Sequence, residues 1–156
     1  MDYNKLTGND DVSFDGILPG PFLLGLLSAF DNRFQASADT FFKEITWKQF
    51  FAIICINMCK DAPTLNELSD IMGSSHQNVK QILLKLEKKG FIRFEEDASD
   101  KRKQRIRLTE ACLAFCEAND EGSRIRITKL FEGIAPDQLA ATIQVISQME
   151  KNLQRF

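Results

Sequence analysis

Near the middle of the chain, two short helical patterns follow one another with only a tight turn between them. Thr64 is placed as an N-cap, and Glu67, three residues later, supplies the capping-box partner. Gly73 ends this first helix, and either Ser74 or Ser75 caps the next one. This spacing predicts a helix-turn-helix arrangement.

Each of the two predicted helices carries one apolar stripe. The first stripe is formed by Leu65, Leu68, Ile71 and Met72. The second helix runs to Lys89 and stops at Gly90, and its stripe is formed by Val79, Ile82, Leu83 and Leu86. One face of each helix is therefore expected to be buried, which leaves the opposite face available for binding.

The pattern changes to alternation directly after the second helix. Ile92 and Phe94 alternate with polar residues, a charged stretch covers residues 97–103, and residues 105–108 alternate again. We predict a two-stranded hairpin with a basic tip, which completes a winged helix-turn-helix lobe over residues 46–109.

Helical patterns flank this lobe on both sides. Pro21 suits a first-turn position of a helix that extends to about Ala38, and Thr46 caps a nearly all-apolar helix up to Lys60. After Thr109 the helical pattern resumes, with Gly122 as one position where a bend can occur and a last helix opening at Pro136. The fold class is mainly α with a small β-hairpin wing, in a single unit of residues 1–156.

The terminal helices carry more apolar surface than a lobe of this size can cover. We therefore expect residues 17–38 and 110–156 to form a dimerisation region, and the partner to be a second copy of the chain.

Positive charge is concentrated in the predicted lobe. The whole chain has a formal net charge of −2, but residues 74–109 contain ten Lys and Arg against five Asp and Glu. This segment is therefore +5 and the remainder −7, a basic module on an acidic body. Such a distribution is compatible with nucleic-acid binding, although a charge run is also typical of a solvated face.

The exposed face of the second helix is the predicted reading surface. A helix-turn-helix places this helix in the major groove of duplex DNA, where amide and ammonium groups can donate to base edges. Free amides at its start can also bind a phosphate. The candidate contacts are Ser74, Ser75, His76, Gln77, Lys80, Gln81 and Lys85. A surface or capping role is an alternative for His76, since no neighbouring carboxylate orients it.

The hairpin tip supplies a second set of candidate contacts. Lys101, Arg102 and Lys103 can reach an adjacent minor groove, where a narrow A·T-rich stretch attracts arginine. Asp100 is expected to hold the Arg102 guanidinium through a bidentate pair.

One segment resembles a known family. The run LNELSDIMGSSHQNVKQILLKLEKKGFIRFEEDASDKRKQRIRLTE, residues 65–110, is similar to the signature of the MarR (multiple antibiotic resistance regulator) family. The resemblance implies a dimeric transcription regulator with a winged lobe in each subunit, in which Asp100 and Arg102 are the wing pair and Arg102 enters the minor groove. It also implies release from an operator by a small-molecule effector.

The chain departs from the family pattern at several positions. Asn78 and Gln81 stand where members often carry Thr and Arg, so the operator cannot be inferred from relatives. Ala98 and Ser99 stand where a proline is common, and Cys112 stands where glycine is frequent.

An apolar cluster offers an effector pocket. The resemblance implies a site for small aromatic compounds between the terminal helices and the lobe, and Phe30, Phe34, Trp47 and Phe51 could line it. An aromatic stripe at helical spacing is more often plain core.

Four cysteines form two pairs at i, i+4 spacing: Cys55 with Cys59, and Cys112 with Cys116. They could bind zinc together or respond to oxidants. Buried, reduced thiols that behave as small hydrophobes are the simpler interpretation, and we predict no metal site and no cofactor. The redox-responsive cysteine near the start of the first helix in family members has no counterpart here.

Other function classes fit less well. A single histidine and the lack of a glycine-rich phosphate loop argue against an enzyme. A winged helix used as a protein–protein module needs no basic wing tip. The chain has no targeting pattern, and its longest apolar run is too short to span a bilayer, so we expect a cytoplasmic protein without membrane association.

Overall fold

The computed structural model of the chain describes residues 3–8 and 11–155. They form seven helices and one two-stranded antiparallel sheet. Two compact units are present, Met1–Cys112 and Leu113–Phe156, and each is described here by itself. Within the described residues, none of the helices is both long and apolar enough to cross a bilayer.

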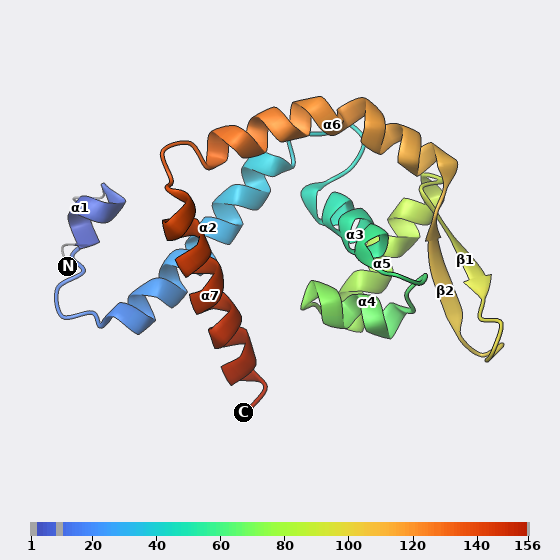
Figure 1. The fold of residues 1–156 in the computed structure, drawn as a ribbon, viewed down its shortest axis with the longest axis horizontal. Helices are drawn as coiled ribbons and strands as arrows, with labels where there is room; N and C mark the ends of the chain where they lie inside the picture. Colours follow the sequence, from blue (N-terminus) through green and yellow to red (C-terminus); the bar gives the residue numbers. More distant parts are fainter. Residues whose placement is uncertain (1–2, 9–10, 156) are drawn as a thin grey trace. The chain divides into compact units, whose positions relative to one another are not determined.

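The first unit begins with two helices outside the predicted lobe (Figure 1). Helix α1 (Tyr3–Thr7) was not expected from its polar sequence, but the Tyr3 ring stacks on Phe22 with centroids 3.9 Å apart. Helix α2 (Pro19–Ala38) begins two residues before Pro21 and ends where predicted.

The lobe consists of α3 (Trp47–Met58), α4 (Leu65–Met72), α5 (His76–Lys88), β1 (Ile92–Glu96) and β2 (Gln104–Leu108). Thr46 and Thr64 both form complete capping boxes, as predicted for Thr64. Ser75, and not Ser74, caps α5. Gly73 adopts φ 59°, a left-handed conformation that glycine tolerates best, and so turns the chain between α4 and α5.

The core of the lobe lies where α3, α4 and α5 meet the hairpin. Ile53, Leu68, Leu83, Leu86 and Ile106 are almost completely buried. Ile71, which the apolar stripe of α4 assigned to the core, is 49% exposed because the short helix turns that side to solvent.

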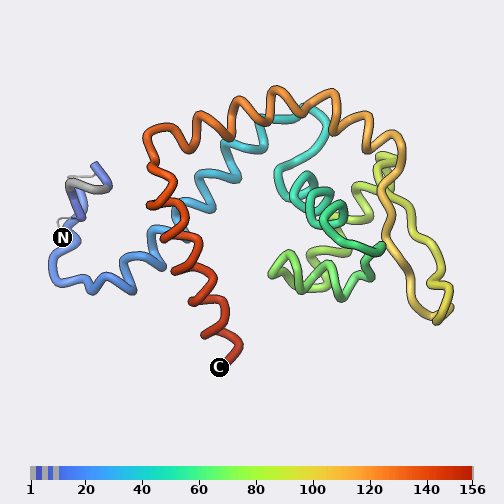
Figure 2. The backbone as a smooth tube through the Cα atoms, in the orientation of Figure 1, coloured from blue at the N-terminus to red at the C-terminus, as the bar shows by residue number. Residues whose placement is uncertain are grey.

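The hairpin pairs Ile92 with Leu108 and Phe94 with Ile106. Its tip, between the two strands, lies at the opposite end of the hairpin from the end of α5 (Figure 2). The strand β2 is also joined to the chain before α4, because the Ile106 amide donates to the Pro63 carbonyl over 2.8 Å. The wing therefore has a fixed base and an outlying tip.

The second unit contains most of α6 (Glu110–Leu130) and all of α7 (Pro136–Leu153). Helix α6 is continuous through Gly122. No residue of α7, all of which is described, is buried. Several large apolar side chains of this unit are exposed: Leu113, Ile125, Ile143, Val145 and Leu153.

Candidate nucleic-acid interface

Helix α5 separates a buried face from an exposed polar face. Val79, Ile82, Leu83 and Leu86 are buried, as the apolar stripe predicted. The predicted reading residues on the opposite side are all exposed: His76, Gln77, Lys80, Gln81 and Lys85. The helix thus offers amide and ammonium donors on one surface.

The start of α5 is organised by Asn78. The Ser75 hydroxyl accepts from the Asn78 amide over 3.3 Å and forms the N-cap. The Ser74 hydroxyl is half-buried and accepts from Asn78 Nδ2 over 2.8 Å. A hydroxyl that accepts a hydrogen bond can still donate one, so both serines keep a donor for an anion.

Helix α5 and the wing tip line one groove. This cavity of about 1070 Å³ includes Lys80 from α5 and Lys101, Arg102 and Lys103 from the tip. Glu87 also lines it, so the positive charge is not uninterrupted. Of the predicted contacts on α5, Lys80 is the one that lines this groove with the three tip residues.

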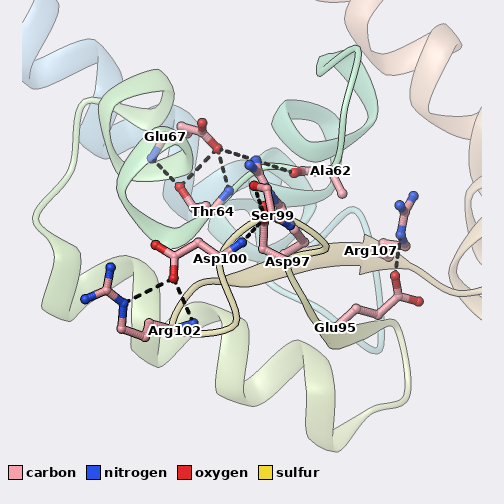
Figure 3. Close-up of polar contacts among 10 residues, drawn as sticks. Ala62, Thr64, Glu67, Glu95, Asp97, Ser99, Asp100, Arg102 and Arg107 are labelled. Carbon is pink, nitrogen blue, oxygen red and sulfur yellow. Dashed lines mark hydrogen bonds and ion pairs between the residues drawn. The ribbon is translucent and has the colours of Figure 1, made fainter.

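The wing pair exists, but with a different geometry from the one expected. Asp100 Oδ1 accepts from the Arg102 main-chain amide over 3.1 Å and from Arg102 Nε over 3.2 Å (Figure 3). Only one of these bonds involves the guanidinium, so Asp100 and Arg102 do not form the expected bidentate guanidinium–carboxylate pair. The same contacts hold the pKa of the Asp100 carboxyl below its ordinary value. The Arg102 side chain is 91% exposed, which leaves it accessible to a partner.

Asp97 organises the loop at the base of the tip, and sequence reasoning did not assign it a role. Its Oδ1 accepts from the Ser99 amide over 2.8 Å, from the Ser99 hydroxyl over 2.6 Å and from the Asp100 amide over 3.0 Å. Its Oδ2 accepts from Arg105 Nε. These hydrogen bonds, with Ser99 first, hold the pKa of Asp97 far below its ordinary value.

Arg105 was counted only as part of the basic segment, yet it connects the wing to the first helix of the helix-turn-helix. Its Nη1 donates to the Ala62 carbonyl over 3.0 Å and to Glu67 Oε2 over 3.1 Å. Glu67 Oε2 also accepts from the Thr64 amide over 2.7 Å, which is half of the α4 capping box. The Asp-x-Ser spacing after β1 could have suggested the Asp97 turn, but nothing local in sequence indicates the Arg105 contacts.

Another set of charges lies on the same face of the hairpin as Arg105, because the register pairs Glu95 with Arg105 and Arg93 with Arg107. Glu95 accepts from Arg93 Nε over 2.7 Å and from Arg107 Nε on the paired strand. These side chains are more exposed than Asp97. They are surface ion pairs, which contribute little to stability.

Three of the four aromatic residues predicted for an effector pocket line one cavity. Phe34, Trp47 and Phe51 surround a space of about 350 Å³, together with Ser74 and Asn78 at the start of α5. Phe30 does not line it; this side chain is 47% exposed and stacks on Phe34 with centroids 5.8 Å apart.

Cys55 lies on α3, Cys59 directly follows that helix, and Cys112 and Cys116 lie on α6. Burial raises the pKa of the Cys55 and Cys59 thiols, and the Cys59 thiol donates to the Cys55 carbonyl over 3.2 Å. Cys112 is buried and Cys116 is half-buried. Among the residues that the structure describes, His, Cys, Asp and Glu form no group of three or more suited to a metal ion.

Comparison with known proteins places this lobe in a family. The model of the MarR family matches residues 45–103, which span α3, α4, α5, β1 and most of the wing tip. Over these residues the lobe is similar to the MarR family. The chain as a whole has the mainly helical, winged-helix fold of MarR-type transcriptional regulators.

Solved structures of MarR-type proteins share this fold at low sequence identity. A MarR/EmrR family transcriptional regulator from Acinetobacter sp. ADP1 is 19% identical with a TM-score of 0.79, over 90% of this chain and 100% of that chain. MepR of S. aureus, solved as a complex with DNA, is 20% identical with a TM-score of 0.72, over 82% and 94%. BpsR of Bordetella bronchiseptica, whose DNA binding is regulated by 6-hydroxynicotinic acid, is 17% identical with a TM-score of 0.72, over 89% and 96%.

Proposed function

We propose that this chain is a sequence-specific DNA-binding transcription regulator of the MarR type that acts as a dimeric repressor. The observation that carries the proposal is the shared groove, in which Lys80 of α5 and the basic tip residues of the wing line one cavity. A helix for the major groove and a basic tip for the adjacent minor groove form a complementary pair of contacts with duplex DNA.

The residues of this surface divide into three roles. Lys80 and Gln81 are exposed in the first half of α5 and read base edges in the major groove. Ser74, Ser75 and Lys85 bind phosphates, and Arg102 enters the minor groove. His76, Gln77, Lys101 and Lys103 add contacts around them, and Asp100 orients Arg102 through the two bonds to Oδ1.

The proposed partner in the dimer is a second copy of the chain, held through residues 17–38 and 110–156. Leu24 on α2 is 56% exposed and Ile143 on α7 is 55% exposed, so each terminal region carries uncovered apolar surface. A two-fold dimer presents two α5 helices, and its operator is therefore an inverted repeat whose half-sites lie about one helical turn apart.

Selection of bound duplexes from a random pool tests this proposal. The full chain should enrich one inverted-repeat sequence with an A·T-rich flank where Arg102 enters the minor groove. Enrichment without any consensus would mean that the lobe binds phosphates only. Failure to retain duplex DNA at low salt would contradict the proposal, since the electrostatic part of binding is strongest there.

We further propose that a small aromatic compound releases the protein from its operator by binding between Phe34, Trp47 and Phe51. Ser74 and Asn78 line the same cavity, so a compound there contacts the start of the recognition helix. Trp47 is the only tryptophan of the chain, and its fluorescence therefore reports on this cavity. An effector should change this fluorescence at the concentrations that release DNA, and Phe51→Ala should weaken both effects together. Release without a change in Trp47 emission would place the effector site elsewhere.

A further inference from the structure

Arg105 differs from the other cations of the wing in how its guanidinium is used. Its side chain is 29% exposed, against 91% for Arg102. It donates to Asp97 in the wing, to Ala62 before α4 and to Glu67 within α4. Because these protein acceptors occupy Nε and Nη1 and the side chain is largely buried, Arg105 is poorly suited to bind a phosphate.

The Asp97 carboxylate joins Arg105 to the residues of the wing tip. One carboxylate oxygen contacts Arg105, and the other accepts from Ser99 and Asp100, the residues that lead into the basic tip (Figure 3). The main chain closes the same loop, since the Asp97 amide donates to the Lys103 carbonyl over 3.0 Å and the Lys103 amide donates to the Asp100 carbonyl over 2.8 Å. The tip is thus tied through one carboxylate to α4, which packs on α5.

From this geometry we infer that Arg105 and Asp97 form a clamp that positions the wing tip relative to α5 and so sets sequence discrimination without touching DNA. The inference rests on the proposed DNA-binding function. An isolated two-stranded hairpin is marginally stable, and its tip lies beyond the last paired residues, Glu96 and Gln104. A tip already held in place loses less conformational entropy when Arg102 enters a groove.

Two conservative variants test the clamp, with a matched control on the same strand. Arg105→Lys keeps the charge and loses the planar fork, and Asp97→Asn keeps the size of the side chain and removes its charge. Arg107→Lys is the control, because Arg107 is 53% exposed and its ion pair is with Glu95, not with Asp97 or α4. For each full-length variant we would measure affinity for the selected duplex and for a random duplex over a range of salt, and thermal stability.

Arg105→Lys and Asp97→Asn should each lower affinity for the selected duplex about tenfold, with random-duplex affinity and salt slope close to wild type. Amide hydrogen exchange offers a readout that needs no DNA, since the Ser99 and Asp100 amides should exchange faster in both variants while the amides of α5 stay protected. Arg107→Lys should change none of these quantities.

Three results would overturn the inference, and they differ from a failure of the proposed function. Parallel loss on both duplexes with a shallower salt slope would make Arg105 a phosphate contact. If both variants kept the wild-type ratio of the two affinities, Arg105 and Asp97 would have no role in sequence discrimination. If the Ser99 and Asp100 amides exchanged hydrogen at the wild-type rate in both variants, Arg105 and Asp97 would not hold the tip in place. If the wild-type chain bound no duplex, both the proposed function and the inference would be wrong. The three results above can be observed only if the wild type prefers the selected duplex to the random one.

Discussion

Asp97 is a well-buried carboxylate at the base of the wing, and hydrogen bonds from Ser99 and Arg105 stabilise its ionised form. Hydrogen bonds from Thr64 likewise lower the pKa of Glu67. A carboxyl whose pKa is lower in the folded than in the unfolded state stabilises the fold when the pH is above the unfolded-state pKa. This stabilisation is lost as the pH falls from the unfolded-state pKa toward the folded-state pKa.

We therefore predict that the gap in stability between wild type and Asp97→Asn depends on pH. The variant should be less stable at pH 6, and the gap should narrow progressively below about pH 4, where the unfolded carboxyl becomes protonated. Urea unfolding of both proteins at pH 6, 4 and 3 measures this difference in the free energy of unfolding. A gap of constant size over this range would mean that the charge of Asp97 does not stabilise the fold.

Sequence reasoning at this scale succeeded where contacts are local. The Thr64 and Glu67 capping box and the pairing of Asp100 with Arg102 join residues two or three positions apart. The contact of Arg105 with Glu67 joins residues 38 positions apart and depends on how the hairpin packs beside α4, so no local spacing encodes it. The Asp100 geometry was predicted incorrectly because a nearby main-chain amide took the place of the second guanidinium donor.

At the scale of elements, the turn between α4 and α5 depends on the backbone conformation of Gly73. A Cβ at Gly73 would meet no atom within 4 Å, so the penalty of a side chain there comes only from its φ of +59°. We predict that Gly73→Ala destabilises the fold by about 1–2 kcal/mol.

Gly122 in α6 is the matched control. A Cβ there would meet only the end of the Arg126 side chain at 3.4 Å, and the helix continues through this position. Gly122→Ala should therefore stabilise the fold by about 0.5–1 kcal/mol, since alanine is the better helix former. Denaturant unfolding of both variants tests the pair, and destabilisation of similar size by both would contradict the account of the turn.

The elements themselves were largely predictable, because helical and alternating patterns in the lobe are strong and well delimited. The exceptions have physical reasons. Helix α1 carries no amphipathic pattern and is accompanied by the aromatic contact of Tyr3 with Phe22. Helix α6 is continuous through Gly122, since a single glycine weakens a helix without ending it.

For the whole molecule, the proposed dimer predicts a particle of twice the 17.8 kDa chain mass in sedimentation at micromolar concentration. Leu24→Glu on α2 should shift the protein toward the monomer, because it places a charge in the proposed interface. Leu84→Glu is the control, since Leu84 on α5 is 43% exposed but lies in the lobe. A wild-type monomer, or equal dissociation by both variants, would contradict the proposed dimerisation region.

The most direct measurement for the central claim compares two cations of the proposed DNA-binding surface on two duplexes. Arg102→Ala should lower affinity for the selected duplex by about 1–3 kcal/mol and change affinity for a random duplex much less, because groove width varies with sequence. Lys85→Ala, a phosphate contact in this account, should weaken both duplexes alike and reduce the salt slope by about one unit. If Arg102→Ala keeps the wild-type ratio of the two affinities, the wing is only a charged loop and its proposed role in recognition is wrong.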